Sequence, residues 1–388
     1  RQAEGAAERL IERGLQAPFP LLRGWLLCAP MTYDFLIIGA GIAGLSAAAE
    51  LVGLGSVLVL EREAHPAHHA SGRSAALYEP RYGLPPVVEL SLASEAAFRA
   101  LPGILSERGL MILAKADQRA AFDRDLAGFQ LEDIGVEAAR SIVPILNPAT
   151  VAFAGTASHA WDIDTDLLIQ GHIRRLKVGG GDLRTSSPVS AIRRWGGLWQ
   201  VTTPMAEVSA RVLINAAGAW VGQIAGMAGV AGPAFTPLRW SMARIAAPAG
   251  HDVARWPMLF GCGESWYAKP DAGALIISPA EEDPLTPQDA WADDMVLAEG
   301  LARYEEMVTE PVTRPLANWA GLRTFSPDRV PVIGPDPVEP AFFWLAGQGG
   351  YGFQTSPAAA RLVAALLGGT APDVGTDLTA RLSPARFA

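Results

Sequence analysis

The sequence predicts an α/β (α+β) fold, in which a domain with a parallel βαβ unit is joined to a second domain built on a mixed or antiparallel sheet. Three observations predict it. A buried strand, a glycine-rich turn and an Ala/Leu helix follow one another from Tyr33 to Leu51. A second strand and glycine-rich turn begin at Phe342, and an Ala/Leu helix is expected from Pro357 to Leu367. Between them, stretches such as Leu238 to Ala246 and Ser265 to Ser278 have the composition of strands.

Length and composition indicate a globular chain of two or three domains. Of its 388 residues, 50% are hydrophobic and 18% are charged, and its 40 glycines and 30 prolines follow no period. This composition excludes collagen-like, coiled-coil and disordered proteins. The formal net charge of -9 provides no basic excess for phosphates. We therefore expect no nucleic-acid partner.

The two cysteines and six histidines form no disulfide framework and no paired metal-ligand pattern. We expect no metal and a cytoplasmic location, with peripheral attachment to a membrane left open. No transmembrane segment is expected, because glycines interrupt the longest apolar tract, Phe35 to Ala49. Residues 1–30 differ from the rest in composition. We expect them to be an extension outside the fold, since Met31 directly precedes the first strand.

The first glycine-rich turn carries the strongest functional signal. Gly39, Gly41 and Gly44 form a GxGxxG pattern, and a second strand from Ser56 ends in Glu61. The first glycine permits a tight turn, the second lets the helix N-terminus approach a pyrophosphate, and the third lets helix and strand pack closely. Glu61 lies 20 residues after Gly41, where dinucleotide-binding βαβ units place the acid that holds a ribose. The pattern predicts a dinucleotide site.

The segments that follow favour a flavin dinucleotide over a nicotinamide one. Small residues from Ala70 to Ala76 would let backbone amides face the flavin end, and Arg73 could neutralise a phosphate or a carboxylate. Val212 to Gly218 is another buried strand with a glycine exit. The second glycine-rich turn, Gly347 to Gly352, lies far along the chain from the first. Two such turns suit a flavin enclosed by segments from both ends of the chain.

Six motifs in order carry a family resemblance: GAGIAG, LERE, SGRSAA, INAAGAW, WAGLRTF and AGQGGYGFQTS. The chain resembles the D-amino acid oxidase-type (DAO) family of FAD-dependent oxidoreductases, and most closely the bacterial D-arginine and D-amino acid dehydrogenases. The resemblance implies a Rossmann-like domain that binds FAD noncovalently. Besides the first glycines, it places cofactor contacts at Ala43, Glu61, Arg62, Ala70, Ser71, Gly72, Arg73, Ser74, Ala75, Ala76, Leu77, Val189, Gly218, Gly349, Gly350, Tyr351, Gly352, Phe353 and Gln354.

The same resemblance places the catalytic site. Arg323 corresponds to the arginine that grips the substrate carboxylate, and Tyr267 to a tyrosine that hydrogen-bonds the same group. Tyr82 corresponds to a tyrosine beside the reacting amine, and Gly350 is placed with these three. The alternatives are a structural salt bridge for Arg323 and core packing for the tyrosines.

Four positions depart from the D-arginine dehydrogenase pattern. Leu110 stands where a glutamate would bind a guanidinium, and Leu77 replaces a histidine. Glu79 replaces a threonine, and Trp240 replaces a second arginine that would bind the carboxylate. Arg244 would share the strand face of Trp240 and could substitute for that arginine. We expect Glu79 to be solvated or ion-paired, and the pocket to be more apolar than in those enzymes.

Two other groups are interpreted as structural. Asp162, Asp164 and Asp166 could suggest a metal site, but we expect them to start a helix. His68 and His69 are adjacent, so we expect their side chains to diverge in a loop near the flavin.

Together these features predict an FAD-dependent amino acid dehydrogenase or oxidase that prefers apolar D-amino acids. A neutral amine would let the Cα hydrogen leave as hydride, and the imine would be hydrolysed to a 2-oxo acid and ammonia. The electron acceptor is left open among a quinone, a carrier protein and oxygen. The alternatives are a 2-hydroxy acid, glycine or a secondary amine as substrate, or a noncatalytic flavin-binding protein. The expected FAD domain comprises residues 31–100, 160–230 and 322–388, and the expected substrate domain comprises residues 101–159 and 231–321.

Overall fold

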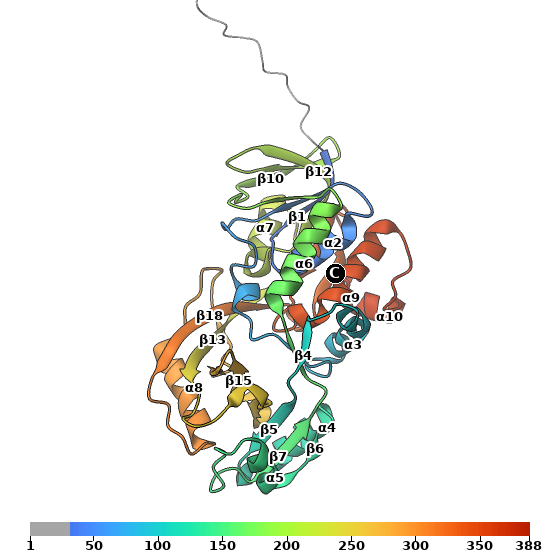
Figure 1. The fold of residues 1–388 in the computed structure, drawn as a ribbon. Helices are drawn as coiled ribbons and strands as arrows, with labels where there is room; N and C mark the ends of the chain where they lie inside the picture. The colour runs from blue at the N-terminus through green and yellow to red at the C-terminus, as the bar shows by residue number, and fades with distance from the viewer. Residues whose placement is uncertain (1–31) are drawn as a thin grey trace, which may run out of the picture. The chain divides into compact units, whose positions relative to one another are not determined.

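The computed structural model describes residues 32–388, so the predicted N-terminal extension lies outside the described residues. Two large sheets of eight and nine strands and a small sheet of three strands organise this part of the chain (Figure 1). Among the described residues, every helix is too short or too polar to cross a lipid bilayer.

The eight-stranded sheet contains the predicted βαβ unit. Its order is β10-β11-β12-β1-β2-β9, and β20 pairs with both β12 and the edge strand β19. Ile37 of β1 lies opposite Val59 of β2 and Ile214 of β12, in parallel register on both sides. The strand bounds are β1 Thr32–Ile38, β2 Val57–Leu60, β9 Asp182–Arg184, β10 Ala191–Trp195, β11 Leu198–Thr202, β12 Glu207–Asn215, β19 Val332–Pro335 and β20 Phe342–Ala346. The carboxyl ends of β1, β2 and β12 therefore meet at one edge, where such sheets bind nucleotides.

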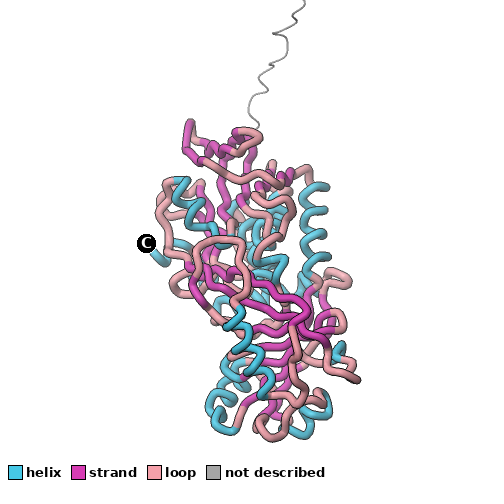
Figure 2. The backbone as a smooth tube through the Cα atoms, turned by 90° about the vertical axis from the view of Figure 1, so that its left-hand side faces the viewer, coloured by secondary structure: helices cyan, strands magenta, loops and turns pink. Residues whose placement is uncertain are grey.

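Helices bury both faces of this sheet. On one face Ile37 packs with Leu45 and Leu362, and on the other Leu36 packs with Ile224. This alternation follows from the two-residue period of a strand. The helices around the sheet are α2 Ile42–Leu51, α3 Pro85–Arg99, α6 Thr165–Val178, α7 Val221–Ala228, α9 Gly352–Gly368 and α10 Thr376–Leu382 (Figures 1 and 2).

Helix α9 begins earlier than the sequence predicts. We expected it to start at Pro357, and it starts at Gly352. Proline has no backbone N–H, so it cannot bond the carbonyl of Phe353 four residues before it. The Ser356 Oγ donates a hydrogen bond of 2.9 Å to that carbonyl instead. This local replacement lets the helix continue through the proline.

The nine-stranded sheet is mixed, as predicted. Its order is β17-β13-β16-β15-β14-β5-β7-β6, with β18 paired to β13, and its one parallel pair is β5 with β14. The bounds are β5 Leu110–Ala114, β6 Glu132–Asp133, β7 Phe153–Ala157, β13 Thr236–Ala246, β14 Met258–Gly261, β15 Tyr267–Asp271, β16 Ala274–Ser278, β17 Asp283–Pro284 and β18 Pro315–Phe325, with helices α4 Arg119–Gly128, α5 Gly135–Ile142 and α8 Asp294–Glu306. The small sheet is β3 Leu77–Tyr78, β8 Trp161–Ile163 and β4 Leu105–Glu107. The predicted fold class is confirmed.

The predicted domain boundary at residue 322 falls inside β18. This strand pairs with β13 from Pro315 to Phe325, so both ends of it belong to the nine-stranded sheet. We propose that each domain comprises the strands of one large sheet. The substrate domain then ends after Phe325 instead of after residue 321.

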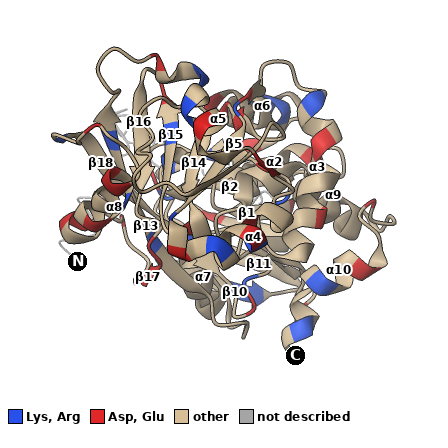
Figure 3. Cartoon of the chain, turned by 90° about the horizontal axis from the view of Figure 1, so that it is seen from below, with Lys and Arg blue, Asp and Glu red and all other residues tan. Residues whose placement is uncertain are grey.

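Charged residues of both signs share several surface helices (Figure 3). On α10, Arg381 pairs with Asp377 at 2.9 Å and with Glu89 of α3 at 2.6 Å. Such exposed pairs each contribute about 0 to 1 kcal/mol. They show that positive and negative side chains lie next to one another on the surface around α10.

Candidate active site

The glycines of the first turn bring strand and helix into close contact. A Cβ on Gly44 would lie 2.0 Å from the Gly39 carbonyl oxygen, and one on Gly39 would lie 2.4 Å from that of Ala216. Gly39 also has a φ of 106°, which disfavours other residues. Gly41 is the N-cap of α2 and supplies no capping side chain. The Ile42 N–H at the start of α2 instead donates a hydrogen bond of 3.0 Å to the Ser71 Oγ. The positive end of α2 still faces the cavity region and favours an anionic ligand nearby.

Glu61 is positioned at the carboxyl end of β2. Its Oε2 accepts a hydrogen bond of 2.8 Å from the Ala40 N–H, and its Oε1 accepts one of 2.9 Å from the Glu63 N–H. The Arg62 guanidinium stacks 4.8 Å from the centroid of the Trp220 ring. A cavity of about 330 Å³ opens here, and its lining includes the predicted residues Gly39, Gly41, Glu61, Arg62, Ala70, Ser71, Arg73, Val189 and Gly218.

A second cavity of about 130 Å³ adjoins the first, because Gly41, Ser71 and Gly218 line both. Backbone and small residues form much of its wall. The predicted residues in its lining are Gly41, Ala43, Ala70, Ser71, Arg73, Ser74, Gly218, Arg323, Gly349, Gly350, Gly352 and Phe353. A large flat ligand fits such a wall, because few side chains project into the space. The α2 N-terminus and the glycine-lined second cavity thus fit a flavin dinucleotide.

Arg73 does not act as a free neutralising charge in this structure. Its Nη1 donates to the carbonyls of Ala290 at 2.9 Å and Ala320 at 2.8 Å, and its Nη2 lies 2.5 Å from the Asp289 carboxylate. The expectation that it neutralises a phosphate or a carboxylate of a ligand is wrong for this arrangement. The guanidinium instead joins the short helix η1 (Ala70–Arg73) to β18 and to the segment before α8.

A third cavity, of about 50 Å³, brings together the predicted catalytic residues. Its lining includes all four of them: Arg323, Tyr267, Tyr82 and Gly350. Leu77 and Glu79 line it too, together with Ser74, Ala75, Ala76, Phe129, Met258, Phe260, Phe353 and Gln354. It shares Ser74, Arg323, Gly350 and Phe353 with the second cavity, so the two adjoin.

Stacking holds the guanidinium of Arg323 in place. It lies 3.3 Å from the centroid of the Trp240 ring. A Cβ on Gly350 would lie 2.6 Å from Arg323 Nη1, so only glycine leaves the guanidinium this position. Among residues 32–388, no carboxylate pairs with it, and the alternative of a structural salt bridge is therefore not observed. The charge remains available for a ligand.

Trp240 also orients Tyr267. The indole Nε1 donates a hydrogen bond of 3.1 Å to the Tyr267 hydroxyl oxygen, and the Ser278 side chain also lies beside this hydroxyl. Burial raises the pKa of Tyr267, so the hydroxyl proton is retained. Arg244 does not replace the missing arginine, because its guanidinium is bound to Asp271 at 3.1 Å.

Tyr82 is held by a residue that the sequence did not indicate. Its hydroxyl donates a hydrogen bond of 2.9 Å to Glu264 Oε2, across a separation of 182 residues. Burial raises the pKa of Tyr82. Tyr82, Glu264 and Arg323 also line an outer cavity of about 660 Å³, together with Tyr351. This outer cavity adjoins the small one and forms its approach.

Glu79 is buried, so the expectation that it is solvated is wrong, and its nearest ionisable partner is His159, whose Nε2 lies 3.7 Å from Oε2. Its side chain lines the small cavity, and only 2% of the residue is exposed. Oε1 accepts a hydrogen bond of 2.9 Å from the Arg81 N–H, whereas Oε2 has no hydrogen-bond partner among the described residues. Burial raises the pKa of this carboxyl to about 7.

Four positions singled out from the sequence lie away from the inner cavities. Gly44 and Gly72 line none of the four, and their packing makes them structural: a Cβ on Gly72 would lie 2.3 Å from the Ala67 carbonyl oxygen. Tyr351 lines only the outer cavity. Leu110 is fully buried in β5 and lines none of them.

The three aspartates have different roles. Asp164 is the N-cap of α6 and accepts a hydrogen bond of 2.8 Å from the Leu167 N–H, and Asp166 lies in the first helical turn. Asp162 belongs to β8, where Arg108 at 2.6 Å and Lys269 at 2.9 Å neutralise it. The helix-start interpretation therefore holds for two of them.

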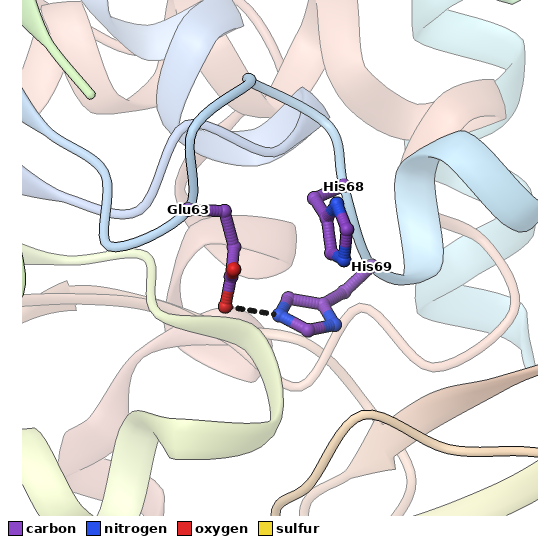
Figure 4. Close-up of side chains that lie close together, drawn as sticks. All are labelled: Glu63, His68 and His69. Carbon is purple, nitrogen blue, oxygen red and sulfur yellow. Dashed lines mark hydrogen bonds and ion pairs between the residues drawn. The ribbon is translucent and has the colours of Figure 1, made fainter. Parts of the chain in front are cut away.

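His68 and His69 do not diverge as expected. Their ring centroids lie 4.8 Å apart, and His69 Nε2 lies 3.0 Å from Glu63 Oε1 (Figure 4). Burial lowers the pKa of His69. The ligand atoms of these three residues lie within 4.8 Å of one another. Because both histidines line the 330 Å³ cavity, we include them in the wall of the dinucleotide site.

Comparison with known proteins identifies the family. The profile of the family DAO, described as FAD dependent oxidoreductase, matches residues 34–366. The chain belongs to the DAO family of FAD-dependent oxidoreductases. FAD is therefore its cofactor, as predicted.

Relatives of this DAO-family chain match over most of its length. It is 26% identical to FAD-dependent oxidoreductase domain-containing protein 1 of Bos taurus, over 87% of this chain and 82% of the relative. It is 27% identical to glycine oxidase of Pseudomonas aeruginosa, over 88% of this chain and 96% of the relative. The crystal structure of glycine oxidase from Geobacillus kaustophilus superimposes with a TM-score of 0.78 at 22% identity, covering 92% of this chain and 99% of that one.

The finer resemblance to D-amino acid dehydrogenases receives less support. The D-amino acid dehydrogenase of Xanthobacter autotrophicus is 41% identical, but over 70 residues, which is 18% of this chain. The family is thus established, and the D-amino acid substrate remains a proposal.

Proposed function

We propose that this chain oxidises the Cα–N bond of an amino acid, with a preference for the D-enantiomer and for an apolar side chain. The observation that carries the proposal is the guanidinium of Arg323, which lies in a small cavity without a carboxylate partner among the described residues. A planar guanidinium binds a carboxylate with two parallel hydrogen bonds. The relative named glycine oxidase supports an amino acid as the substrate.

In this proposal the residues that line the small cavity have different roles. Arg323 binds the carboxylate, and Tyr267 donates its hydroxyl proton to the same group. The rings of Phe129 and Phe260 and the side chain of Met258 exclude water from the reacting carbon. When bound, FAD supplies the electron sink for the hydride. The protein thereby contributes orientation and a dry site.

The preference for an apolar side chain rests on Leu77. It lines the cavity where the related dehydrogenases carry a histidine, and the nearby Trp240 replaces a charged residue by an aromatic one. A guanidinium left unpaired in such surroundings would cost several kcal/mol. The preference for the D-enantiomer rests on the motif resemblance alone.

A second candidate substrate is glycine or an N-methylated glycine. The small volume of the inner cavity, about 50 Å³, favours it, because a short substrate needs little space beyond Cα. The glycine oxidase relative supports the same assignment.

The test is an anaerobic screen that follows bleaching of the flavin absorbance. The FAD-loaded protein is mixed with both enantiomers of the amino acids, with glycine and N-methylglycine, and with 2-hydroxy acids. Fastest reduction by an apolar D-amino acid is the expected result. Fastest reduction by a 2-hydroxy acid would overturn the amine assignment. Reduction by none of them would indicate a noncatalytic flavin-binding protein.

A further inference from the structure

Glu79 is a buried acid with one carboxylate oxygen that makes no hydrogen bond among the described residues. One carboxylate oxygen is bound by the Arg81 N–H, and the other is both buried and without a hydrogen bond among the described residues. A buried carboxylate without a partner is costly unless a proton or a cation joins it. The chain keeps this acid in the wall of the cavity that contains Arg323.

The groups around Glu79 leave its free oxygen unneutralised. The Arg81 guanidinium acts on it through its charge, and Arg81 N–H occupies the other oxygen. His159 Nε2, in the segment between β7 and β8, lies 3.7 Å from Oε2 but is hydrogen-bonded at 2.9 Å to the Phe129 carbonyl. Burial lowers the pKa of His159, so this imidazole is neutral near pH 7. The remaining neighbours in the cavity wall are largely apolar or aromatic.

The proposed reaction requires the substrate amine to lose a proton, and Glu79 is the carboxylate in the lining of the cavity that contains Arg323. An amino acid arrives as its ammonium form, and a hydride leaves Cα readily only when the nitrogen has a free electron pair. One N–H bond must therefore break first, with the proton moving to a base and the electron pair remaining on nitrogen. A base whose pKa lies near the working pH serves best, and burial brings the Glu79 carboxyl into that range.

We propose that Glu79 accepts the ammonium proton of the substrate while Arg323 holds its carboxylate. This inference rests on the proposed amine oxidation and assigns it a base. In this step the N–H bond breaks, an O–H bond forms on Oε2, and no electrons are exchanged with the cofactor. The neutral amine that results is ready to be oxidised by the flavin.

The test compares Glu79→Gln with the unchanged protein, both loaded with FAD, in anaerobic stopped-flow reduction. The probes are D-norleucine and D-lysine, which share a carbon chain and differ by one terminal ammonium. With D-norleucine, the unchanged protein should be reduced faster as the pH rises, with an inflection near pH 7. Glu79→Gln should lose this inflection and react about 100-fold more slowly at pH 7. Its rate should recover toward pH 10, where the amine is already neutral.

Two further variants separate a chemical role from a structural one. Glu79→Asp keeps an acid, so its reduction rate should be lower but should still show the inflection near pH 7. This variant also provides the test of the proposal if Glu79→Gln fails to bind FAD. Glu132→Gln, on the exposed strand β6, should behave as the unchanged protein. Equal flavin spectra in all four proteins would show that the cofactor site is intact.

Each other outcome overturns a defined statement. If the unchanged protein is reduced and Glu79→Gln keeps the same pH profile, Glu79 is not the base. If D-lysine reacts fastest and the glutamine variant loses only that preference, Glu79 binds a side-chain cation instead. If neither probe, nor any amino acid of the screen, reduces the unchanged protein, the proposed function itself fails.

Discussion

Among single residues, Trp240 determines how the Arg323 guanidinium is held beside the small cavity. An arginine at this position would repel Arg323, whereas the indole ring faces the guanidinium at 3.3 Å and attracts it. The same indole hydrogen-bonds Tyr267. One residue thus orients both groups that we propose for the carboxylate.

Arg323→Ala should leave FAD binding largely intact and lower kcat/KM by a factor of tens to thousands. Losing a buried charged donor to a carboxylate costs about 2 to 5 kcal/mol. No second arginine compensates, because Arg244 is bound to Asp271. Steady-state kinetics with the best substrate of the screen measure the effect. Arg211→Ala, on the exposed side of β12, is the matched control, and equal kinetics in both variants would place the carboxylate elsewhere.

His172 should make the protein sensitive to acid. It is 7% exposed on α6, neither ring nitrogen has a hydrogen-bond partner among residues 32–388, and burial lowers its pKa to about 4. The unfolded chain takes up this proton near pH 6.5, so the stability present above that pH is lost as the pH falls toward 4. His172→Leu should reduce the difference in unfolding free energy between pH 7 and pH 4 by about 2 to 3 kcal/mol.

Urea titrations at both pH values measure this difference. His65→Leu, at an exposed position, should leave it unchanged. If the unfolding free energy of His172→Leu falls as much between pH 7 and pH 4 as that of the unchanged protein, other groups cause the loss of stability in acid.

At the scale of elements, Lys269 joins strands that are distant in the sequence. Its ammonium group on β15 lies 2.9 Å from Asp162 of β8 and donates to the Ala75 carbonyl in the segment before β3. Asp162 is also bound by Arg108. Since Ala75 lines the small cavity, this buried network holds one wall of the site.

Lys269→Met should lower the unfolding free energy by about 1 to 3 kcal/mol and weaken FAD binding. The loss stays below that of a fully broken buried pair, because Arg108 still neutralises Asp162. Thermal unfolding and flavin titration measure the two effects. Lys115→Met removes an exposed pair with Glu306 and should change either quantity little. A similar response in both variants would argue against a special role for the Lys269 network.

At the scale of the whole described region, the cofactor site draws on both large sheets. The 130 Å³ cavity is lined by Gly41, which follows β1, and by Trp240 and Met242 of β13 in the other sheet. A ligand that binds only the folded state stabilises it in proportion to the logarithm of its concentration. FAD should therefore stabilise the two sheets together.

The purified protein should be yellow, and acid precipitation should release the flavin into the supernatant. Cys262 lies in none of the four cavity linings, and burial raises the pKa of its thiol to about 12, so it is a poor nucleophile for attachment. Adding FAD to the apoprotein at 100 times its Kd should add about 2.7 kcal/mol of stability. Differential scanning calorimetry measures this gain. Yellow colour that stays in the pellet would contradict noncovalent binding.

The βαβ unit, the two glycine-rich turns and the family could all be predicted from the amino-acid sequence. These features depend on residues that are neighbours in the chain, and strand periodicity and glycine spacing can be read directly from their order. The resemblance to the DAO family also grouped Arg323, Tyr267, Tyr82 and Gly350 as site residues. Arg323 and Gly350 lie within two of the six motifs, whereas the two tyrosines were assigned by correspondence with the family.

The partners of individual side chains became visible only in the folded chain. Arg73 binds Asp289 across 216 residues, and Tyr82 binds Glu264 across 182 residues, and neither separation leaves a local pattern. Glu79 looked like a surface acid because it stands beside Pro80 and Arg81, yet the folded chain buries it in the cavity wall. Burial and pairing arise from contacts between distant segments, so local sequence could not reveal them.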